Sequence, residues 1–404
     1  MAGSIAGTDE DSNLTSQGPQ FRLGGASFIA LLIFTQLPGV LAYTVTVPLL
    51  AGMAQDLAHD QASAYLVKLV AGILGPAMAI GAPLGGWLAD KFDRRGLIIA
   101  LGVLYVLAGV APWTLQSLEL IVSTRFLTGL AAGALMAIGM TMVGDYLPEE
   151  RRAGTIGMLS ALNMIASLIT LPAAGFVGDA GWRLAFLLYA LGTPVILLAI
   201  PRSLPVPSRM KATAGLEADP APRFHMPYLL LLLALAIGII LTIPGIYVSF
   251  HLETMGLGKV STVGLLMMLN SLIAAVFSSI FGRATARISS KLIFLIGFST
   301  IAAGLIMLAL ASGYALAIPA LLLMGAGMGW LVPALMARAV ASVDEGRRGR
   351  VVGMVQGASS IAPLFGIALL EPLMPSYGTE GIFLIVGGLS AVCFLVMLAA
   401  RNGK

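Results

Sequence analysis

Charge is scarce in this chain. Only 10% of its 404 residues are charged, 58% are hydrophobic, and the mean hydropathy is +0.96. A soluble domain of this size needs a far more charged surface, whereas a surface that faces lipid is as apolar as a core. The composition therefore predicts an integral protein of a lipid bilayer, and the net charge of +4 reflects membrane topology rather than binding of nucleic acid.

Cysteine and histidine are nearly absent. Cys393 is the only cysteine, which excludes a disulfide within the chain. The three histidines show no ligand spacing, so we expect no metal site. The chain also lacks the patterns G-x-x-x-x-G-K-[ST], H-E-x-x-H and G-x-S-x-G. We therefore expect neither direct ATP drive, nor a cofactor, nor an intramembrane enzyme.

Long apolar runs fill most of the chain. A helix needs roughly 20 residues to cross the hydrocarbon layer, and twelve runs have about this length. The fold class predicted is an all-α membrane protein with twelve transmembrane helices. The predicted spans are Ala26–Leu50, Tyr65–Leu88, Leu97–Thr114, Leu120–Gly144, Gly154–Gly178, Trp182–Ile200, Pro227–Phe250, Thr262–Phe281, Leu292–Ala311, Tyr314–Ala337, Val351–Leu370 and Gly381–Ala400.

The basic residues predict how the chain is oriented. All but four of the 23 lie in the terminal tails and the even-numbered loops, and the exceptions are Lys68, Arg125, Arg183 and Lys259. Cytoplasmic loops retain Lys and Arg, so both termini are expected in the cytoplasm. The predicted organisation is a cytoplasmic tail (1–24), a six-helix bundle (25–200), a cytoplasmic linker (201–226), a second six-helix bundle (227–400) and a short cytoplasmic tail (401–404).

The two predicted bundles repeat one another at an offset of 196 residues. Arg151-Arg152 matches Arg347-Arg348 within a longer similar loop, and Gly129 and Gly133 match Gly325 and Gly329. A third match aligns Gly86…Lys91…Arg95 with Gly282…Arg287…Lys291. Duplicated halves are common in transporters. The repeat therefore predicts two pseudo-symmetric halves.

Proline interrupts several of the predicted spans. Pro38-Gly39 and Pro244-Gly245 lie in the first and seventh spans, and Pro172 lies in the fifth. A break in a helix leaves backbone groups without their helical hydrogen bonds, and a ligand can satisfy these groups. Breaks at matched positions in the two halves therefore point to a binding site. The alternative is that Pro and Gly are simply frequent in membrane helices.

Arg125 is a lone charge in the fourth span, and no acidic residue lies at comparable depth in the sequence pattern. Such a residue usually faces the bundle interior or water. Its repeat partner is Leu321, so packing alone does not require arginine there. Four interpretations stay open: tuning of a proton site, binding of an anionic substrate group, hydrogen bonds to carbonyls of a broken helix, or a structural tie between helices.

Polar side chains within the spans are candidates for a cavity wall. They are Gln36, Tyr43, Asn163, Asn270 and Gln356. Each could equally hold helices together by hydrogen bonds.

The loop after the second span carries the most specific motif. The stretch from Gly86 to Arg95, Gly-Trp-Leu-Ala-Asp-Lys-Phe-Asp-Arg-Arg, resembles the signature G-x-L-A-D-[RK]-x-G-R-R of the major facilitator superfamily. Arg125…Gly129 and Asp145…Arg152 resemble two further signatures of the same family. The resemblance covers the whole chain, and its short loops are most similar to the bacterial drug and solute efflux branch.

This resemblance implies a major facilitator fold and a gating latch. Asp90, Arg94, Arg95 and Asp145, with Gly86, would hold the cytoplasmic side shut when the protein opens outward, because guanidinium groups suit carboxylates. Asp93 departs from the signature, which has Gly there. The alternative is a plain positive-inside loop.

The resemblance implies a secondary transporter in a bacterial inner membrane. It would export small amphipathic compounds by alternating access, in exchange for protons, and function as a monomer. Only Pro172 and Gly175 remain of the fifth-helix pattern usual in antiporters. Glu371, beside Pro372, is the candidate titrating partner of Arg125. The alternative function is a symporter or facilitator for an organic anion or a sugar, with Arg125 as the charge that binds substrate.

Overall fold

The computed structural model describes residues 25–200, 228–342 and 348–399, and every regular element within these ranges is a helix. The predicted tails 1–24 and 401–404 and the predicted linker 201–226 lie outside the described residues. So do residues 343–347, which begin the second copy of the repeated loop motif.

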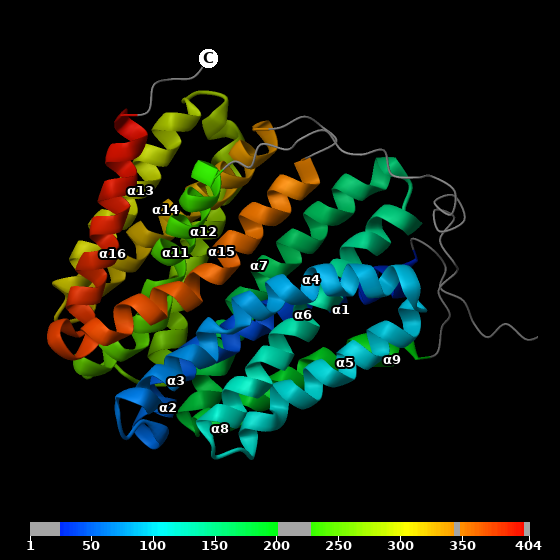
Figure 1. Cartoon of the computed structure of the whole chain (residues 1–404), viewed down its shortest axis with the longest axis horizontal. Coiled ribbons are helices and arrows are strands. Elements are labelled where there is room, and N and C mark those ends of the chain that lie inside the picture. Colours follow the sequence, from blue (N-terminus) through cyan, green and yellow to red (C-terminus); the bar gives the residue numbers. More distant parts are fainter. Residues whose placement is uncertain (1–24, 201–227, 343–347, 400–404) are drawn as a thin grey trace, which may run out of the picture.

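Two groups of helices follow one another along the chain, and they occupy different sides of Figure 1. The N-terminal half consists of α1 (Ala26–Thr46), η2 (Val47–Leu49), α2 (Leu50–Leu57), α3 (Gln61–Gly72), α4 (Leu74–Lys91), α5 (Arg94–Val110), η3 (Ala111–Trp113), α6 (Leu118–Tyr146), α7 (Glu149–Asp179), α8 (Trp182–Ala185), η4 (Phe186–Gly192) and α9 (Thr193–Ala199). The C-terminal half consists of α11 (Tyr228–Thr254), α12 (Val260–Thr285), α13 (Ser290–Ala309), α14 (Tyr314–Ala341), α15 (Arg348–Leu370), η7 (Glu371–Leu373) and α16 (Met374–Ala399).

The described residues contain eleven stretches that are long and apolar enough to cross a membrane. The last stretch, Val351–Ala399, is 49 residues long and holds both α15 and α16, which η7 separates. Twelve membrane-crossing helices result, as the apolar runs predict. Large apolar side chains such as Leu107, Leu229 and Leu369 are exposed on the outside of these helices. An apolar exterior of this kind suits contact with lipid tails.

The first two spans extend further than their apolar patterns indicate. The first continues beyond Leu50 to Leu57, through the 3-10 turn η2 that begins beside Pro48. The second begins at Gln61 rather than Tyr65, because Asp60 and Ser63 form a reciprocal cap there. Polar side chains at a helix start satisfy free backbone N–H groups, so the helix extends beyond its apolar part.

Helix packing repeats at the sequence offset of 196. Gly129 of α6 lies against the carbonyl of Leu74 in α4, and Gly325 of α14 lies against the carbonyl of Asn270 in α12. Gly133 and Gly329 contact Met78 and Ala274 in the same way. A β-carbon at any of these glycines would come within 3 Å of the facing carbonyl oxygen. Glycine thus lets the same helix pair approach closely in both halves, and the predicted pseudo-symmetry of the two bundles is confirmed.

The proline-containing helices are not broken. Pro38 lies inside α1, Pro172 inside α7 and Pro244 inside α11, and each helix continues through its proline. The prediction that Pro38-Gly39, Pro172 and Pro244-Gly245 break these helices is therefore wrong. A proline inside a helix removes one backbone hydrogen bond and leaves one carbonyl free. In a membrane bundle neighbouring groups can satisfy that carbonyl, so the helix tolerates the proline.

Candidate functional site

A cavity of 490 Å³ lies between the two halves. The N-terminal half contributes residues of α1, α3, α4 and α7 to its wall, among them Tyr43 and Gly75. The C-terminal half contributes residues of α11, α12, α14 and α15, among them Gly245, Asn270 and Gln356. Ligand cavities for small molecules commonly have volumes of about 300–1,000 Å³, so this one accommodates a small organic compound.

The two ends of the molecule differ in charge. The end that we name the basic end carries the basic residues Lys91, Arg94, Arg95, Arg151, Arg152, Arg283, Arg287, Lys291 and Arg338, together with the acidic residues Asp90, Asp93, Asp145, Glu149 and Glu150. The opposite end carries mainly acidic residues, namely Asp56, Asp60, Glu119, Asp179, Glu253 and Glu380, with Arg183 and Lys259 as its basic residues.

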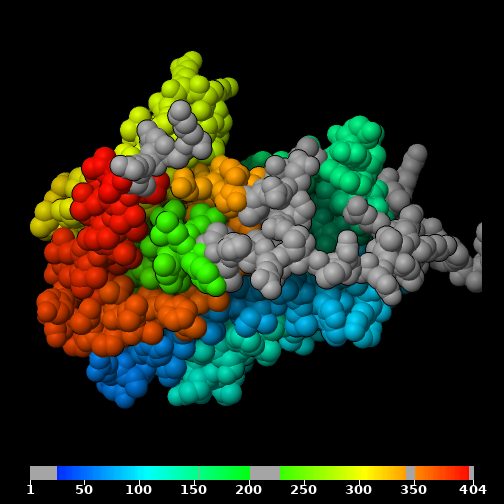
Figure 2. All heavy atoms as spheres, turned by 45° about the horizontal axis from the view of Figure 1, so that its top comes forward, coloured from blue at the N-terminus to red at the C-terminus, as the bar shows by residue number. Residues whose placement is uncertain are grey.

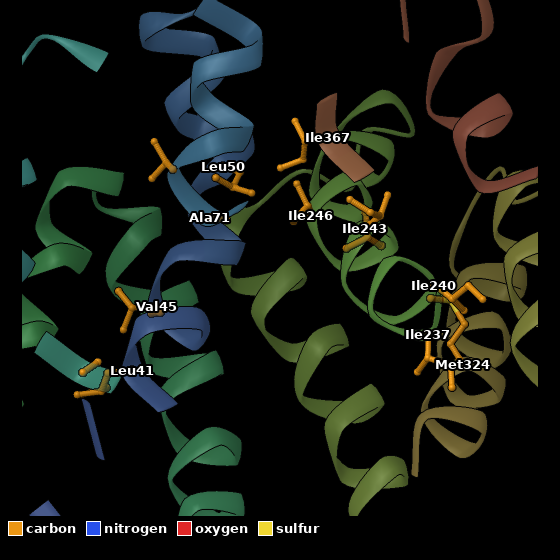
Figure 3. Close-up of a cluster of buried hydrophobic side chains, with 14 of the residues drawn as sticks. Leu41, Val45, Leu50, Ala71, Ile237, Ile240, Ile243, Ile246, Met324 and Ile367 are labelled. Carbon is orange, nitrogen blue, oxygen red and sulfur yellow. The ribbon is translucent and has the colours of Figure 1, made fainter. Parts of the chain in front are cut away.

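At the opposite end the two halves are in direct contact. Gln55 Nε2 donates to Glu253 Oε1 at 2.5 Å, and the Ser261 backbone N–H donates to Asp179 Oδ1 at 3.1 Å. A β-carbon at Gly175 of α7 would come within 3 Å of the Val260 carbonyl oxygen at the start of α12. Figure 3 shows Leu50 and Ala71 of the N-terminal half facing Ile246 and Ile367 of the C-terminal half. Apolar packing and hydrogen bonds together close this end.

At the basic end the halves are separated. Several glycines there have no described atom within 4 Å of the position that a β-carbon would take, namely Gly144, Gly154, Gly157, Gly282, Gly353 and Gly357. In Figure 2 the region around residue 290 (yellow) and the region around residue 150 (blue-green) stand apart at this end. Among the residues that the structure describes, one end is therefore closed and the other is open.

A buried ion pair joins the halves on the closed side of the cavity. Lys68 Nζ of α3 lies 2.5 Å from Oε1 of Glu371, the first residue of η7, and the two side chains are only 4% and 5% exposed. The Tyr247 hydroxyl of α11 donates to Glu371 Oε2 at 2.7 Å. The Lys68 ammonium also lies 4.9 Å from the ring centre of Phe250. Both carboxylate oxygens are thus occupied, which is the condition for a buried charge to be tolerated.

A second cavity reaches the same carboxylate. It has a volume of 570 Å³ and is lined by the start of α3, including Gln61 and Tyr65, and by Ala368, Glu371 and Pro372. The central cavity is lined by Ala71 and Gly75, about one and two turns further along the chain than Lys68. Lys68 and Glu371 therefore lie between a crevice at the closed end and the central cavity.

No sequence motif marks Lys68 as a functional residue. The sequence does contain one indication, because Lys68 is one of the four basic residues that lie outside the terminal tails and the even-numbered loops. Glu371 was identified as a candidate, but only as a partner of Arg125. The structure pairs it with Lys68 instead, and the sequence interpretation that left Arg125 as the only deeply placed charge is incorrect.

Arg125 is fully buried within the N-terminal half and does not line the central cavity. Its Nη2 donates to the carbonyls of Ala108 and Gly109, at 2.6 and 2.9 Å, near the end of α5. Its guanidinium lies 4.9 and 4.7 Å from the ring centres of Phe186 and Tyr189. This geometry favours the interpretation of Arg125 as a tie between α6, α5 and η4.

The remaining cavity candidates separate into two groups. Tyr43, Asn270 and Gln356 line the central cavity. Gln36 does not, because it is buried and its Nε2 donates to the Met136 carbonyl at 3.2 Å. Asn163 of α7 is half-buried and is not part of the described cavity wall. Spacing along a helix identified polar positions, but only the packing distinguishes the cavity wall from the polar links between helices.

The residues of the predicted latch lie at the basic end. Arg94 Nη2 forms an ion pair with Asp145 Oδ2 at 2.6 Å, which joins α5 to α6 within the N-terminal half. Arg95 donates to the carbonyls of Ala199 and Ile200. Asp90 is exposed. No described atom lies within 4 Å of the position that a β-carbon would take at Gly86. A role for these residues in closing the basic end stays a prediction.

Within the described residues, no group of three or more His, Cys, Asp or Glu side chains is placed to hold a metal ion. The only cysteine, Cys393, is buried and not in a disulfide.

Comparison with known proteins gives a consistent picture. The sequence profile of the Major Facilitator Superfamily matches residues 32–263 and 257–403. The MFS-type transporter YwfA of Bacillus subtilis is 26% identical, with 88% of each chain covered. The class C tetracycline resistance protein of Escherichia coli is 24% identical, covering 89% of this chain and 92% of that protein. The multidrug resistance protein MdtL of Klebsiella pneumoniae is also 24% identical, covering 93% and 95%.

Solved structures share the fold at low sequence identity. The nucleoside transporter NupG matches with a TM-score of 0.71 at 14% identity, covering 93% of this chain and all of the other. A D-xylose–proton symporter matches with a TM-score of 0.70 at 15% identity, covering 92% and 97%.

Proposed function

The chain belongs to the Major Facilitator Superfamily and is a multi-pass membrane transporter rather than an enzyme. From this premise we propose that it exports small amphipathic organic compounds from a bacterial cytoplasm, by alternating access and in exchange for protons. The observation that carries the proposal is the buried Lys68–Glu371 pair, which joins the two halves between the central cavity and the crevice at the closed end.

The orientation of the molecule follows from its charge. Basic loops are retained in the cytoplasm, so we place the basic end there and both termini with it. The central cavity then faces the cytoplasm in this conformation, and the closed end faces the outside. Importers and exporters both visit an inward-open conformation, so the direction of transport is proposed from full-length similarity to two resistance proteins.

Proton exchange follows from what holds the closed end together. A proton on Glu371 neutralises its carboxylate and removes the attraction to Lys68. The titratable groups that face this carboxylate are Lys68 and Tyr65 from α3 and Tyr247 from α11, while Glu380 of α16 is exposed and lies near His251. Protonation from the outer crevice would therefore favour opening to the outside, where the compound leaves. The protonated protein would then close without the compound, and loss of the proton to the inside would re-form the Lys68–Glu371 pair.

The alternative of an organic-anion carrier based on Arg125 loses its support. The guanidinium is already bonded to two backbone carbonyls and does not line the cavity. Symport or facilitated diffusion of a neutral compound is distinguished from exchange by the experiment below.

The test uses protein reconstituted into vesicles that contain a pH-sensitive dye and have an acidic interior. Cationic, neutral and anionic compounds are added in turn to the outside of vesicles with wild type, Glu371→Gln and the control Asp60→Asn. We expect uptake of a compound by wild type to raise the internal pH, because protons leave as the compound enters, whereas a symporter would lower it. Glu371→Gln should transport the compound without moving protons. Transport without proton movement in wild type, or intact coupling in Glu371→Gln, would refute proton exchange through this carboxylate. A response to anions alone would restore the alternative function.

Asp60→Asn is a matched control because Asp60 is an acid at the same end of the molecule. It is exposed at the start of α3, and hydrogen bonds from the hydroxyl and backbone N–H of Ser63 lower its pKa. It stays ionised near neutral pH, so its own titration does not enter the measurement. Asparagine caps a helix about as well as aspartate, and α3 should remain intact.

Alternating access is tested at the closed end itself. Spin labels are attached at Gln55→Cys and Glu253→Cys in a Cys393→Ser background, since Cys393 is the only native cysteine. We expect a short distance at neutral pH, and a growing population of longer distances as the pH falls. The Glu371→Gln variant should have a larger population of the longer distance than wild type at every pH. A single short distance under all conditions would exclude opening at this end.

A further inference from the structure

The central cavity has no charged side chain in its described wall. Its polar members are hydroxyl and amide groups, carried by α1, α11, α12 and α15. Its apolar members include four methionines, which are Met78, Met267, Met328 and Met336. The nearest charges on the closed side, Lys68 and Glu371, are bonded to each other. A ligand in the cavity therefore meets thioethers, aliphatic groups and neutral dipoles.

Four of the eight polar residues of the wall are already engaged. Thr44, Thr242 and Ser359 donate to backbone carbonyls of their own half, at 3.0, 2.6 and 3.2 Å. Asn270 Nδ2 donates to the Leu321 carbonyl at 2.8 Å, which leaves its amide oxygen and one N–H for a ligand. Thr44 and Thr242 bond to their own helices and Ser359 bonds to α11, so these hydroxyl protons are already used and add little to the recognition of a ligand.

Four polar residues of the described wall are not engaged: Ser271 of α12, and three residues of α15 and α1. Gln356, Ser360 and Tyr43 make no side-chain hydrogen bond within the described part of the chain. Gln356 and Ser360 lie four residues apart in α15 and thus share one face of that helix. The Tyr43 hydroxyl and the Ser360 backbone both lie within 3 Å of where a β-carbon of Gly75 would be, so Tyr43 is close to Ser360. The three form a polar set that spans both halves.

We propose that the cavity binds an uncharged amphipathic compound, whose polar group bonds to Gln356, Ser360 and Tyr43 and whose apolar body packs on the methionines. The proposal rests on the transport function above. Closing the basic end removes water from the cavity, and an ion left there without a countercharge would be strongly disfavoured. A neutral amide, hydroxyl or carbonyl group loses its hydrogen bonds with water on entering the cavity. Hydrogen bonds to these three side chains can replace them. Methionine adapts to varied shapes, which suits a range of apolar bodies.

The same arrangement lets one ligand bridge the two halves. Tyr43 belongs to the N-terminal half, whereas Gln356 and Ser360 belong to the C-terminal half. Tyr43 already lies close to Ser360 in this conformation, so the ligand can bond to both halves before the basic end closes.

The test measures binding to purified protein in lipid nanodiscs, without a proton gradient. The probes are matched trios built on one aromatic skeleton, such as 1-naphthylacetamide, 1-naphthylacetate and 2-(1-naphthyl)ethylamine, at neutral pH. We expect the amide to bind more tightly than the anion and the cation of its trio. Because no turnover is needed, failure here is distinguishable from failure of the transport proposal, which is tested with vesicles.

Two substitutions of Gln356 test whether the ligand binds beside this residue. Gln356→Leu removes a neutral hydrogen-bonding group and should weaken amide binding about tenfold. Gln356→Glu puts a carboxylate in the cavity and should turn the preference towards the amine. Asn163→Leu is the control, since Asn163 is a half-buried amide outside the cavity wall and its loss should leave all three affinities unchanged.

Three outcomes overturn the proposal. The first is a wild-type preference for the anion or the cation. The second is a set of affinities that neither Gln356→Leu nor Gln356→Glu changes in folded protein, as judged by thermal unfolding. The third is no binding of any member of several trios, which would exclude the cavity as a site for uncharged amphiphiles.

Discussion

Replacing Arg125 with Leu, the residue at the equivalent position 321 of the second half, should destabilise the protein and leave transport chemistry intact. The substitution removes charge-assisted hydrogen bonds to Ala108 and Gly109 and the contacts with the rings of Phe186 and Tyr189. Hydrogen bonds to a charged group contribute about 1.5–3 kcal/mol each, and each ring contact contributes about 0.5–2 kcal/mol. These gains are opposed by the cost of burying the guanidinium, whose Nε and Nη1 have no hydrogen-bond partner.

The net loss expected for Arg125→Leu is about 3 kcal/mol, because burying the charge offsets a large part of the gross contacts. Arg125→Lys keeps the charge but loses the planar geometry that stacks on rings, so an intermediate loss is expected. Arg183→Leu is a matched control, since Arg183 is a half-buried arginine over the Trp182 ring with no hydrogen bond to the chain from Nη1. It should change stability by less than Arg125→Leu.

The assay is an unfolding titration in mixed micelles, together with proton-coupled transport by the folded fraction in vesicles. Arg125→Leu should unfold at a lower denaturant concentration, while its coupling ratio and its affinity for a transported compound match wild type. A variant with unchanged stability but no proton coupling would refute this reasoning. It would show that Arg125 acts in transport and that its hydrogen bonds to carbonyls are incidental.

Three further predictions concern the two ends of the molecule. Gly75→Val would place methyl groups against the Ser360 carbonyl and the Tyr43 hydroxyl, and it should therefore separate α4 from α15 and lengthen the Gln55–Glu253 label distance; an unchanged distance in folded protein would contradict the close approach. Asp145→Asn leaves the buried Arg94 without its carboxylate and should lower stability by about 1–3 kcal/mol, measured by the same unfolding titration; equal stability would indicate that water replaces the carboxylate. Asp90→Asn should not alter stability, because Asp90 is exposed here, but it should slow transport if the latch closes the basic end in the outward-open state; wild-type rates would remove Asp90 from the latch.

Much of the fold could be predicted from the sequence for a simple physical reason. A bilayer demands about 20 apolar residues per crossing helix, so spans such as Tyr314–Ala337 are evident from composition alone. The offset of 196 also predicts packing, because glycines that allow close helix contact recur at matched positions, as Gly129 and Gly325 do. Helix ends were less accurate, since the cap formed by Asp60 and Ser63 extends α3 into a polar segment.

The candidate site depended on tertiary structure. Lys68 and Glu371 lie 303 residues apart, and nothing local to either residue indicates that they meet. Arg125 was the most conspicuous charge in the sequence, yet its partners are backbone carbonyls, which every residue carries and no sequence pattern marks. Gln36 and Gln356 are the same residue type in apolar helices, but one donates to a neighbouring helix and the other faces the cavity. The sequence thus determined solvent, spans and symmetry, which depend on local composition. The tertiary structure decided which polar groups are satisfied by the protein and which remain for a ligand, because that depends on contacts between distant helices.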